Sequence, residues 1–98
     1  MSLKKLTNIN QLKKGQPFHH TTNDGKVTSY EFICIHPKNE GYILALNLFT
    51  QNGDKIYIPN LYKEEYWVGE YDDNFFTQKR IEYHQRMIKC LEERLNKK

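Results

Sequence analysis

A chain of 98 residues with a net charge of +3 has room for one domain and one compact hydrophobic core. No apolar run approaches the roughly 18 residues that span a bilayer, which excludes the class of membrane-spanning helices for this sequence. The first residues, Met1 to Lys5, also lack the apolar segment of a secretory signal peptide, so the sequence predicts a cytoplasmic protein.

Charged residues are grouped along the chain. Residues 1–14 carry four lysines and no carboxylate, and residues 64–78 carry five carboxylates and no basic residue. Residues 79–98 carry seven basic and three acidic residues. Such blocks favour charge pairing within the molecule, or between two copies of it, at least as readily as contact with nucleic acid.

Four or five short β-strands are predicted before residue 72. The strands are expected at residues 16–22, 26–36, 42–50, 55–58 and 66–71. Residues 7–14 are predicted to form a helical turn that ends at Gly15, and hairpin turns are expected at 23–25, 37–41 and 52–53. Residues 60–65 are compatible with a second helical turn capped by Asn60.

Residues 30–49 are expected to organise the sheet. Two apolar runs flank a polar turn there, and neither run alternates between apolar and polar residues. A strand that is apolar on both faces requires cover on both faces. We therefore expect a central antiparallel hairpin with the hydrophobic core on one face and a helix on the other.

Residues 75–96 contain no glycine or proline and are predicted to form one long helix. One face of this helix carries an apolar stripe at alternating spacings of four and three residues, formed by Ile81, His84, Ile88, Leu91 and Leu95 and widened by Met87. The helix would measure about 33 Å, whereas short strands span about 17–20 Å. Its first half is expected to cover the hairpin, and its overhanging second half to pair with a second copy as a homodimer.

The strand segment resembles an SH3-like small barrel. The likeness rests on the meander of short strands, which is entered through the sequence LKKGQPF at 12–18, and on the helical turn at 60–65. It covers about residues 7–71 and implies a fold only, because the acidic and aromatic ligand loop of eukaryotic SH3 domains has no counterpart here. The composition, rich in lysine and asparagine, also resembles that of small phage- or prophage-encoded proteins.

No constellation for metal binding or catalysis is predicted. His19 and His20 are adjacent and would point to opposite faces of a strand, and Cys34 and Cys90 form no metal-binding spacing with a histidine. Both cysteines are interpreted as reduced, buried thiols. Although His36 follows Cys34 by two residues, a thiol between two isoleucines is better explained as a small core residue than as a nucleophile. We therefore assign no catalytic residue, metal ligand or cofactor.

The predicted fold is α+β, with a single domain over residues 1–98. A small antiparallel β-meander or SH3-like barrel at 7–71 precedes one long α-helix at 75–96 that packs on it. The leading hypothesis of function is a non-enzymatic accessory protein of phage or mobile-element type. It would act through protein contacts and self-association, with an interface formed by His84, Ile88, Leu91 and Leu95.

The alternative hypothesis is a small barrel that binds single-stranded DNA or RNA. Bases would stack on Tyr57, Tyr62 and Trp67, and phosphates would contact Lys55 and Lys63, with Lys13 and Lys14 as further candidates. The acidic residues around Trp67 oppose this hypothesis, because they would repel a phosphate backbone. The same aromatic residues with acidic neighbours suit contact with a basic protein partner.

Overall fold

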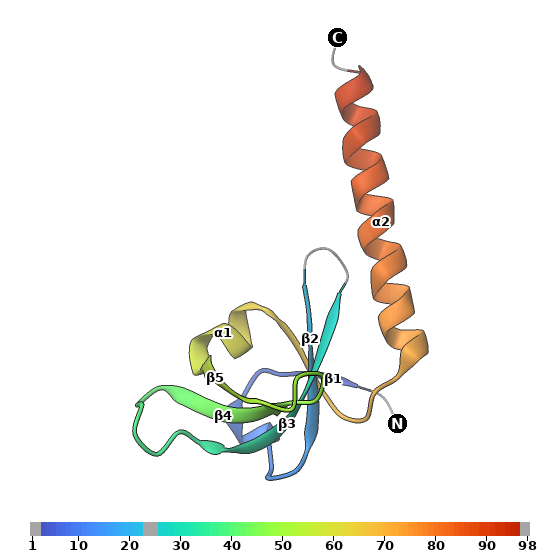
Figure 1. The fold of residues 1–98 in the computed structure, drawn as a ribbon. Coiled ribbons are helices and arrows are strands. Elements are labelled where there is room, and N and C mark those ends of the chain that lie inside the picture. The colour runs from blue at the N-terminus through green and yellow to red at the C-terminus, as the bar shows by residue number, and fades with distance from the viewer. Residues whose placement is uncertain (1–2, 23–25, 97–98) are drawn as a thin grey trace.

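The computed structural model describes residues 3–22 and 26–96 and shows an antiparallel sheet followed by one long helix (Figure 1). Within these residues the strands are β1 (Lys4–Lys5), β2 (Pro17–Thr21), β3 (Val27–Ile35), β4 (Tyr42–Asn47), β5 (Gly53–Tyr57) and β6 (Glu65–Val68). The helices are the 3-10 helix η1 (Ile9–Gln11), α1 (Ile58–Lys63) and α2 (Asp73–Asn96). Hydrogen bonds order the strands β1-β6-β2-β3-β4-β5 in one sheet.

The predicted α+β class, with an antiparallel sheet before one long helix, is confirmed. Of the two alternatives predicted for the strands, a meander or a small barrel, the structure has an open sheet, because β1 and β5 lie at its opposite edges and do not pair with each other. Strand β1 was not predicted, since Lys4 and Lys5 have no preference for strands. It pairs with Val68 and Trp67 of β6 and brings the described strands to six.

The two predicted helical turns are confirmed in shifted positions. Asn8 caps η1, and its backbone N–H donates to the side-chain oxygen of Gln11, which forms a capping box. Gly15 does not end this turn as predicted: η1 ends at Gln11 with Leu12 as its C-cap, and Gly15, with a φ of +81°, lies in the separate turn from Lys13 to Gln16. The second turn is α1, which begins at Ile58 because Pro59 is favoured in the first turn of a helix.

The hairpin turn predicted at residues 52–53 is wrong. Gly53 already belongs to β5, and the chain reverses at residues 48–51, where Gln51 adopts a φ of 63°. The side-chain oxygen of Asn47 accepts hydrogen bonds from the backbone N–H groups of Phe49 and Thr50, and these bonds fix the earlier turn. The turn predicted at 23–25 lies outside the described residues.

The hydrophobic core lies on one face of the sheet. Leu61 of α1 and Leu6, which follows β1, are both fully buried against that face. The buried cluster consists of Leu6, Leu12, Phe18, Phe32, Ile43, Ala45, Ile56, Leu61, Tyr66 and Val68. This cluster contains no residue of α2, so the segment from β1 to β6 packs around one core without the long helix.

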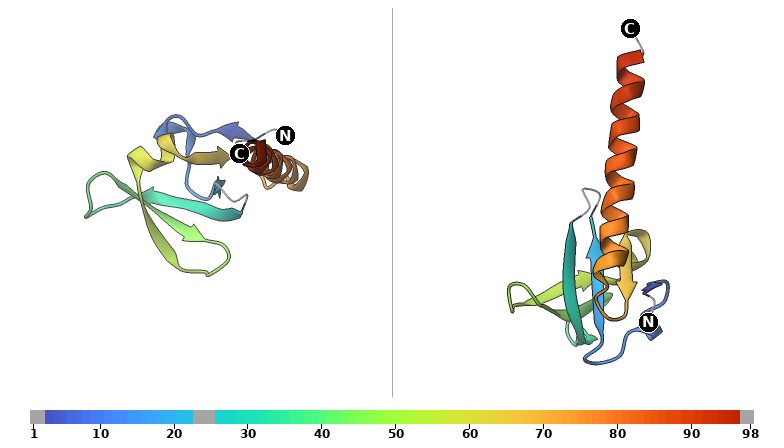
Figure 2. Two further views of the ribbon diagram at one scale, coloured as in Figure 1. Left: turned by 90° about the horizontal axis from the view of Figure 1, so that it is seen from above. Right: turned by 90° about the vertical axis from the view of Figure 1, so that its right-hand side faces the viewer.

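The opposite face of the β3–β4 hairpin is not covered by the helix, in contrast to the prediction. On β4, Ile43 and Ala45 are fully buried, whereas Leu44 and Leu46 are only half-buried. Helix α2 instead starts over β2 and β6, at the other end of the sheet (Figure 2). The cause is the short loop at 69–72, which returns the chain over the strand that it has just left.

Phe76 anchors the start of α2. Its side chain is 1% exposed, and its ring meets the ring of His19 edge-on with 5.3 Å between centroids. The His19 ring is held at both nitrogens: Nε2 donates to the carbonyl oxygen of Gly69 at 2.9 Å. Because a carbonyl oxygen only accepts, Nδ1 is the acceptor for the Ser29 hydroxyl at 2.8 Å.

A second contact supports the anchor. The ring of Phe75 packs edge-on against Trp67 of β6, with 4.8 Å between centroids. One turn further, the Lys79 ammonium group lies 4.8 Å from the centre of the same indole, in a cation–π contact. These two contacts fix the rotation of α2 about its axis.

Beyond these turns, α2 leaves the sheet. All residues from His84 to Asn96 are exposed, and the helix extends as a rod away from the strands (Figure 2). The extents of 55 × 29 × 25 Å reflect this rod. The helix therefore packs on the sheet through its first half only, and the surface that it covers is β2–β6 rather than the β3–β4 hairpin.

Removal of the Phe76 ring should destabilise the protein. We expect Phe76→Ala to lower the free energy of unfolding by about 3 kcal/mol, because it empties a fully buried site. Urea denaturation followed by the fluorescence of Trp67, the single tryptophan, measures this change. Thr77→Ala, at an exposed neighbouring position, is the control and should change stability little. A loss below about 1 kcal/mol for Phe76→Ala would show that the ring does not anchor α2.

Stability should also decrease in mild acid. Burial lowers the pKa of His19 below its ordinary value of 6.5, although Gly69 and Glu70 partly oppose the shift. The unfolded chain then binds more protons than the folded chain just below pH 6.5, so the free energy of unfolding falls as the pH is lowered through that range. One proton gives a slope of up to about 1.4 kcal/mol per pH unit.

Urea titrations between about pH 7.5 and pH 5 measure the slope. Burial also lowers the pKa of His20, so His19→Gln should reduce the slope without abolishing it. An unchanged slope in His19→Gln would contradict the assignment.

Candidate interaction surface

A row of exposed apolar side chains runs along α2, and we call it the α2 stripe. It consists of Ile81, Met87, Ile88, Leu91 and Leu95, which are 43%, 43%, 56%, 52% and 68% exposed. Single exposed apolar residues are common on protein surfaces, but a continuous row of them marks a surface that contacts another molecule.

The α2 stripe faces away from its own sheet. A helix turns by about 100° per residue, which places Phe76, Lys79 and Tyr83 on the side that meets the strands. The centre of the α2 stripe lies roughly 115° around the helix axis from that side, and Met87 forms the margin of the stripe nearest to the sheet. A rotation of the helix that covered the stripe would expose Phe76, so the stripe and the sheet cannot cover each other while the anchor is intact.

The predicted interface residues lie together on this surface. His84 is exposed between Ile81 and Ile88, and its ring meets the ring of Tyr83 edge-on with 5.4 Å between centroids. Ile88, Leu91 and Leu95 follow it toward the end of the helix, on the part that lies clear of the strands. Periodicity in the sequence was sufficient to place these residues on one face, because the helix is regular from Asp73 to Asn96.

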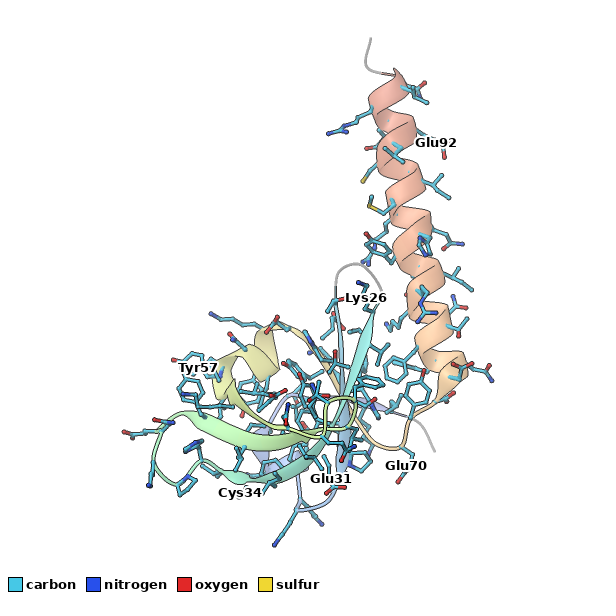
Figure 3. The ribbon with its side chains drawn as sticks, in the orientation of Figure 1. Lys26, Glu31, Cys34, Tyr57, Glu70 and Glu92 are labelled. Carbon is cyan, nitrogen blue, oxygen red and sulfur yellow. The ribbon has the colours of Figure 1, made fainter. Side chains whose placement is uncertain are left out.

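The residues predicted for contact with nucleic acid or protein do not form one surface. Tyr57 is 45% exposed at the end of β5, and Figure 3 shows it at the far side of the sheet from α2. Trp67 lies beneath the start of α2, where its Nε1 donates to the Thr21 hydroxyl at 3.2 Å. Its indole faces Phe75 and Lys79 and is therefore unavailable for stacking on a base.

The remaining members of that set have local partners. The Lys55 ammonium group lies 5.1 Å from the centre of the Tyr42 ring, which also packs against Tyr57. The Tyr62 hydroxyl accepts a hydrogen bond of 2.9 Å from the backbone N–H of Ile9 and so ties α1 to η1. Lys63 lines an open cleft of about 440 Å³ together with Glu64 and Glu65.

The acidic segment begins beside a histidine. Glu64 Oε1 lies 3.6 Å from His20 Nε2, and the His20 ring stacks on Tyr66 with 4.4 Å between centroids. Burial lowers the pKa of His20 and raises the pKa of Tyr66, so both rings are neutral near pH 7. The contacts among Glu64, His20 and Tyr66 connect β2 with β6, so packing within the sheet accounts for the positions of these three side chains.

The cysteines do not lie in a common site. Cys34 is half-buried on β3 and Cys90 is exposed on α2, and neither forms a disulfide. The interpretation of both as buried thiols is therefore wrong for Cys90, because that part of α2 lies clear of the sheet. Among the described residues no group of three or more histidine, cysteine or acidic side chains is arranged to hold a metal ion.

One basic surface was not predicted as a unit. Lys4 of β1 and the pair Lys13–Lys14 line a groove of about 640 Å³. The surplus of four lysines in residues 1–14 is the sequence feature that points to it. The groove itself depends on the pairing of β1 with β6, which no sequence pattern indicates.

No helix in the described part of the chain is long and apolar enough to span a membrane. Over 80 residues, 81% of its length, the chain is 28% identical to the "DNA helicase/primase complex-associated protein" of Human herpesvirus 6A (strain Uganda-1102) and to the protein of the same name of Human herpesvirus 6B (strain Z29). The chain spans only 11% of the length of these proteins. No protein-family model and no solved structure matches the chain. These findings show a similarity to one segment of a viral accessory protein.

Proposed function

We propose that the chain is a non-enzymatic accessory protein that acts through protein contacts and associates with itself through the α2 stripe. One observation carries the proposal: Ile88, Leu91 and Leu95 are more than half exposed on a helix half that lies clear of its own sheet. The likeness to a protein associated with a viral helicase–primase complex supports a role in an assembly rather than in catalysis. It also agrees with an origin in a virus, phage or other mobile element.

The spacing of the α2 stripe favours a second copy of α2 as its partner. Alternation of four and three residues from Ile81 to Leu95 is the repeat that lets side chains of one helix insert between those of another. The exposed residues beside the stripe carry both signs of charge, for example Arg94 next to Glu92 and Glu93. Two copies of α2 would therefore not repel each other along their whole length.

The available surface sets the expected affinity. Burial of a side chain that is about half exposed contributes roughly 1 kcal/mol, and the five members of the stripe occur twice in a dimer. The loss of translational and rotational freedom on association opposes this gain. We therefore expect a dissociation constant in the micromolar range rather than an obligate dimer.

A charge placed in the α2 stripe should abolish association. We expect Leu91→Asp to be monomeric at concentrations where the parent chain is dimeric, because the carboxylate would have to be buried without a partner. Sedimentation equilibrium between about 10 and 500 µM measures the change, and the dissociation constant should rise at least about 30-fold, which corresponds to about 2 kcal/mol.

Cys90→Asp is the matched control. It introduces the same charge at the adjacent position, but Cys90 lies outside the α2 stripe, so dimerisation should persist. A strict monomer of the parent chain at about 500 µM would refute self-association. Equal loss of association in both variants would instead show that charge on α2, and not the stripe, controls it.

A further inference from the structure

The groove at the edge of the sheet is the second exposed feature that packing does not explain. We call it the basic groove; it is lined by Lys4, Lys13, Lys14 and Asn10, with Val68 and Gly69 of the β6 edge as its wall. Its lysines come from two parts of the chain that are nine residues apart, and β1 brings them together by pairing with β6 (Figure 1).

Backbone hydrogen bonds fix the turn that carries two of the lysines. The Gln16 N–H donates to the carbonyl oxygen of Lys13 at 2.9 Å, and the Gln16 side-chain oxygen accepts from the Lys13 N–H at 3.1 Å. The Gly15 N–H donates to the carbonyl oxygen of Phe32 at 2.8 Å, which ties the turn to β3. The positions of Lys13 and Lys14 are therefore set by the sheet, although their side chains are exposed.

All charged side chains that line the basic groove are positive. No carboxylate lines it, and no acidic side chain of residues 3–22 or 26–96 forms an ion pair with Lys4, Lys13 or Lys14. None of the carboxylates of the acidic block that opposed nucleic-acid binding in the sequence lines the basic groove, and Glu64 lies beside His20 instead. Asp72 accepts a hydrogen bond from the Phe75 N–H at the start of α2.

We propose that the basic groove binds the phosphodiester backbone of a nucleic acid without reading its sequence. Lysine ammonium groups contact phosphates as point charges, and such contacts require neither stacking rings nor a buried apolar pocket. The lining supplies no aromatic ring and only one apolar side chain, Val68. A protein partner needs apolar or aromatic anchors for affinity, so the lining favours phosphate contact over an acidic peptide.

The expected binding is weak and strongly dependent on salt. Three lysines contact up to three phosphates, which predicts a slope of log K against log salt concentration of about −2 for a single strand and about −2.7 for a duplex. Single-stranded and double-stranded nucleic acids present the same phosphate groups to the lysines. Fluorescence anisotropy with a 20-nucleotide oligothymidylate and with a 20-base-pair duplex identifies which of the two forms is preferred.

The test compares two triple variants of equal net charge. Lys4→Gln/Lys13→Gln/Lys14→Gln should weaken binding at about 20 mM salt at least tenfold and reduce the salt slope by about 2. Lys38→Gln/Lys55→Gln/Lys63→Gln removes three exposed lysines that lie outside the basic groove and should bind nearly as the parent does. Thermal unfolding of both variants verifies that each is folded.

Three outcomes would overturn the proposal. The first is absence of binding to either oligonucleotide at about 20 mM salt, and the second is an equal loss in the two triple variants, which would show that net charge alone drives the contact. The third is binding of polyglutamate, dependent on the same three lysines, without binding of oligonucleotide, which would assign the basic groove to an acidic protein. Sedimentation of the same triple variants should show unchanged self-association, so this test is independent of the α2 stripe.

Discussion

The contact between Phe76 and His19 determines the shape of the molecule. The His19 ring is fixed by Ser29 on one side and by Gly69 on the other, so it presents a rigid edge to the first turn of α2. A helix held at one end by a buried ring has its direction set there, and the remaining turns follow as a straight rod. The exposure of the residues from His84 to Asn96 is therefore a consequence of where this one contact lies.

The same contact leaves two apolar surfaces uncovered in one chain. The α2 stripe faces away from the strands, and Leu44 and Leu46 on the outer face of β4 are only half-buried. If α2 had folded back along the β3–β4 hairpin, one surface would have covered the other. The anchor over β2 and β6 prevents that, and a second molecule is the remaining way to remove this apolar area from water.

Periodicity predicted the elements but not their arrangement. The long helix and its stripe from Ile81 to Leu95 could be predicted because a regular repeat of side chains is a local property. The direction of α2 could not, because it depends on the loop at 69–72 and on His19, about fifty residues earlier in the chain. Strand β1 was missed for a similar reason: Lys4 and Lys5 form a strand only because the edge of β6 is available to them. Apolarity on both faces of residues 30–49 indicated a need for cover without indicating what supplies it.

The two proposed surfaces would reinforce each other. The basic groove lies at the β1–β6 edge, whereas α2 extends as a rod away from the sheet (Figure 2). A dimer formed through the α2 stripe would therefore leave the groove of each copy open. Three phosphate contacts per groove give weak binding, but two grooves held in one dimer make the second contact intramolecular, and avidity then exceeds the affinity of either groove alone. Each groove binds phosphate by its own three lysines, and pairing of the helices would add avidity to that binding without being required for it.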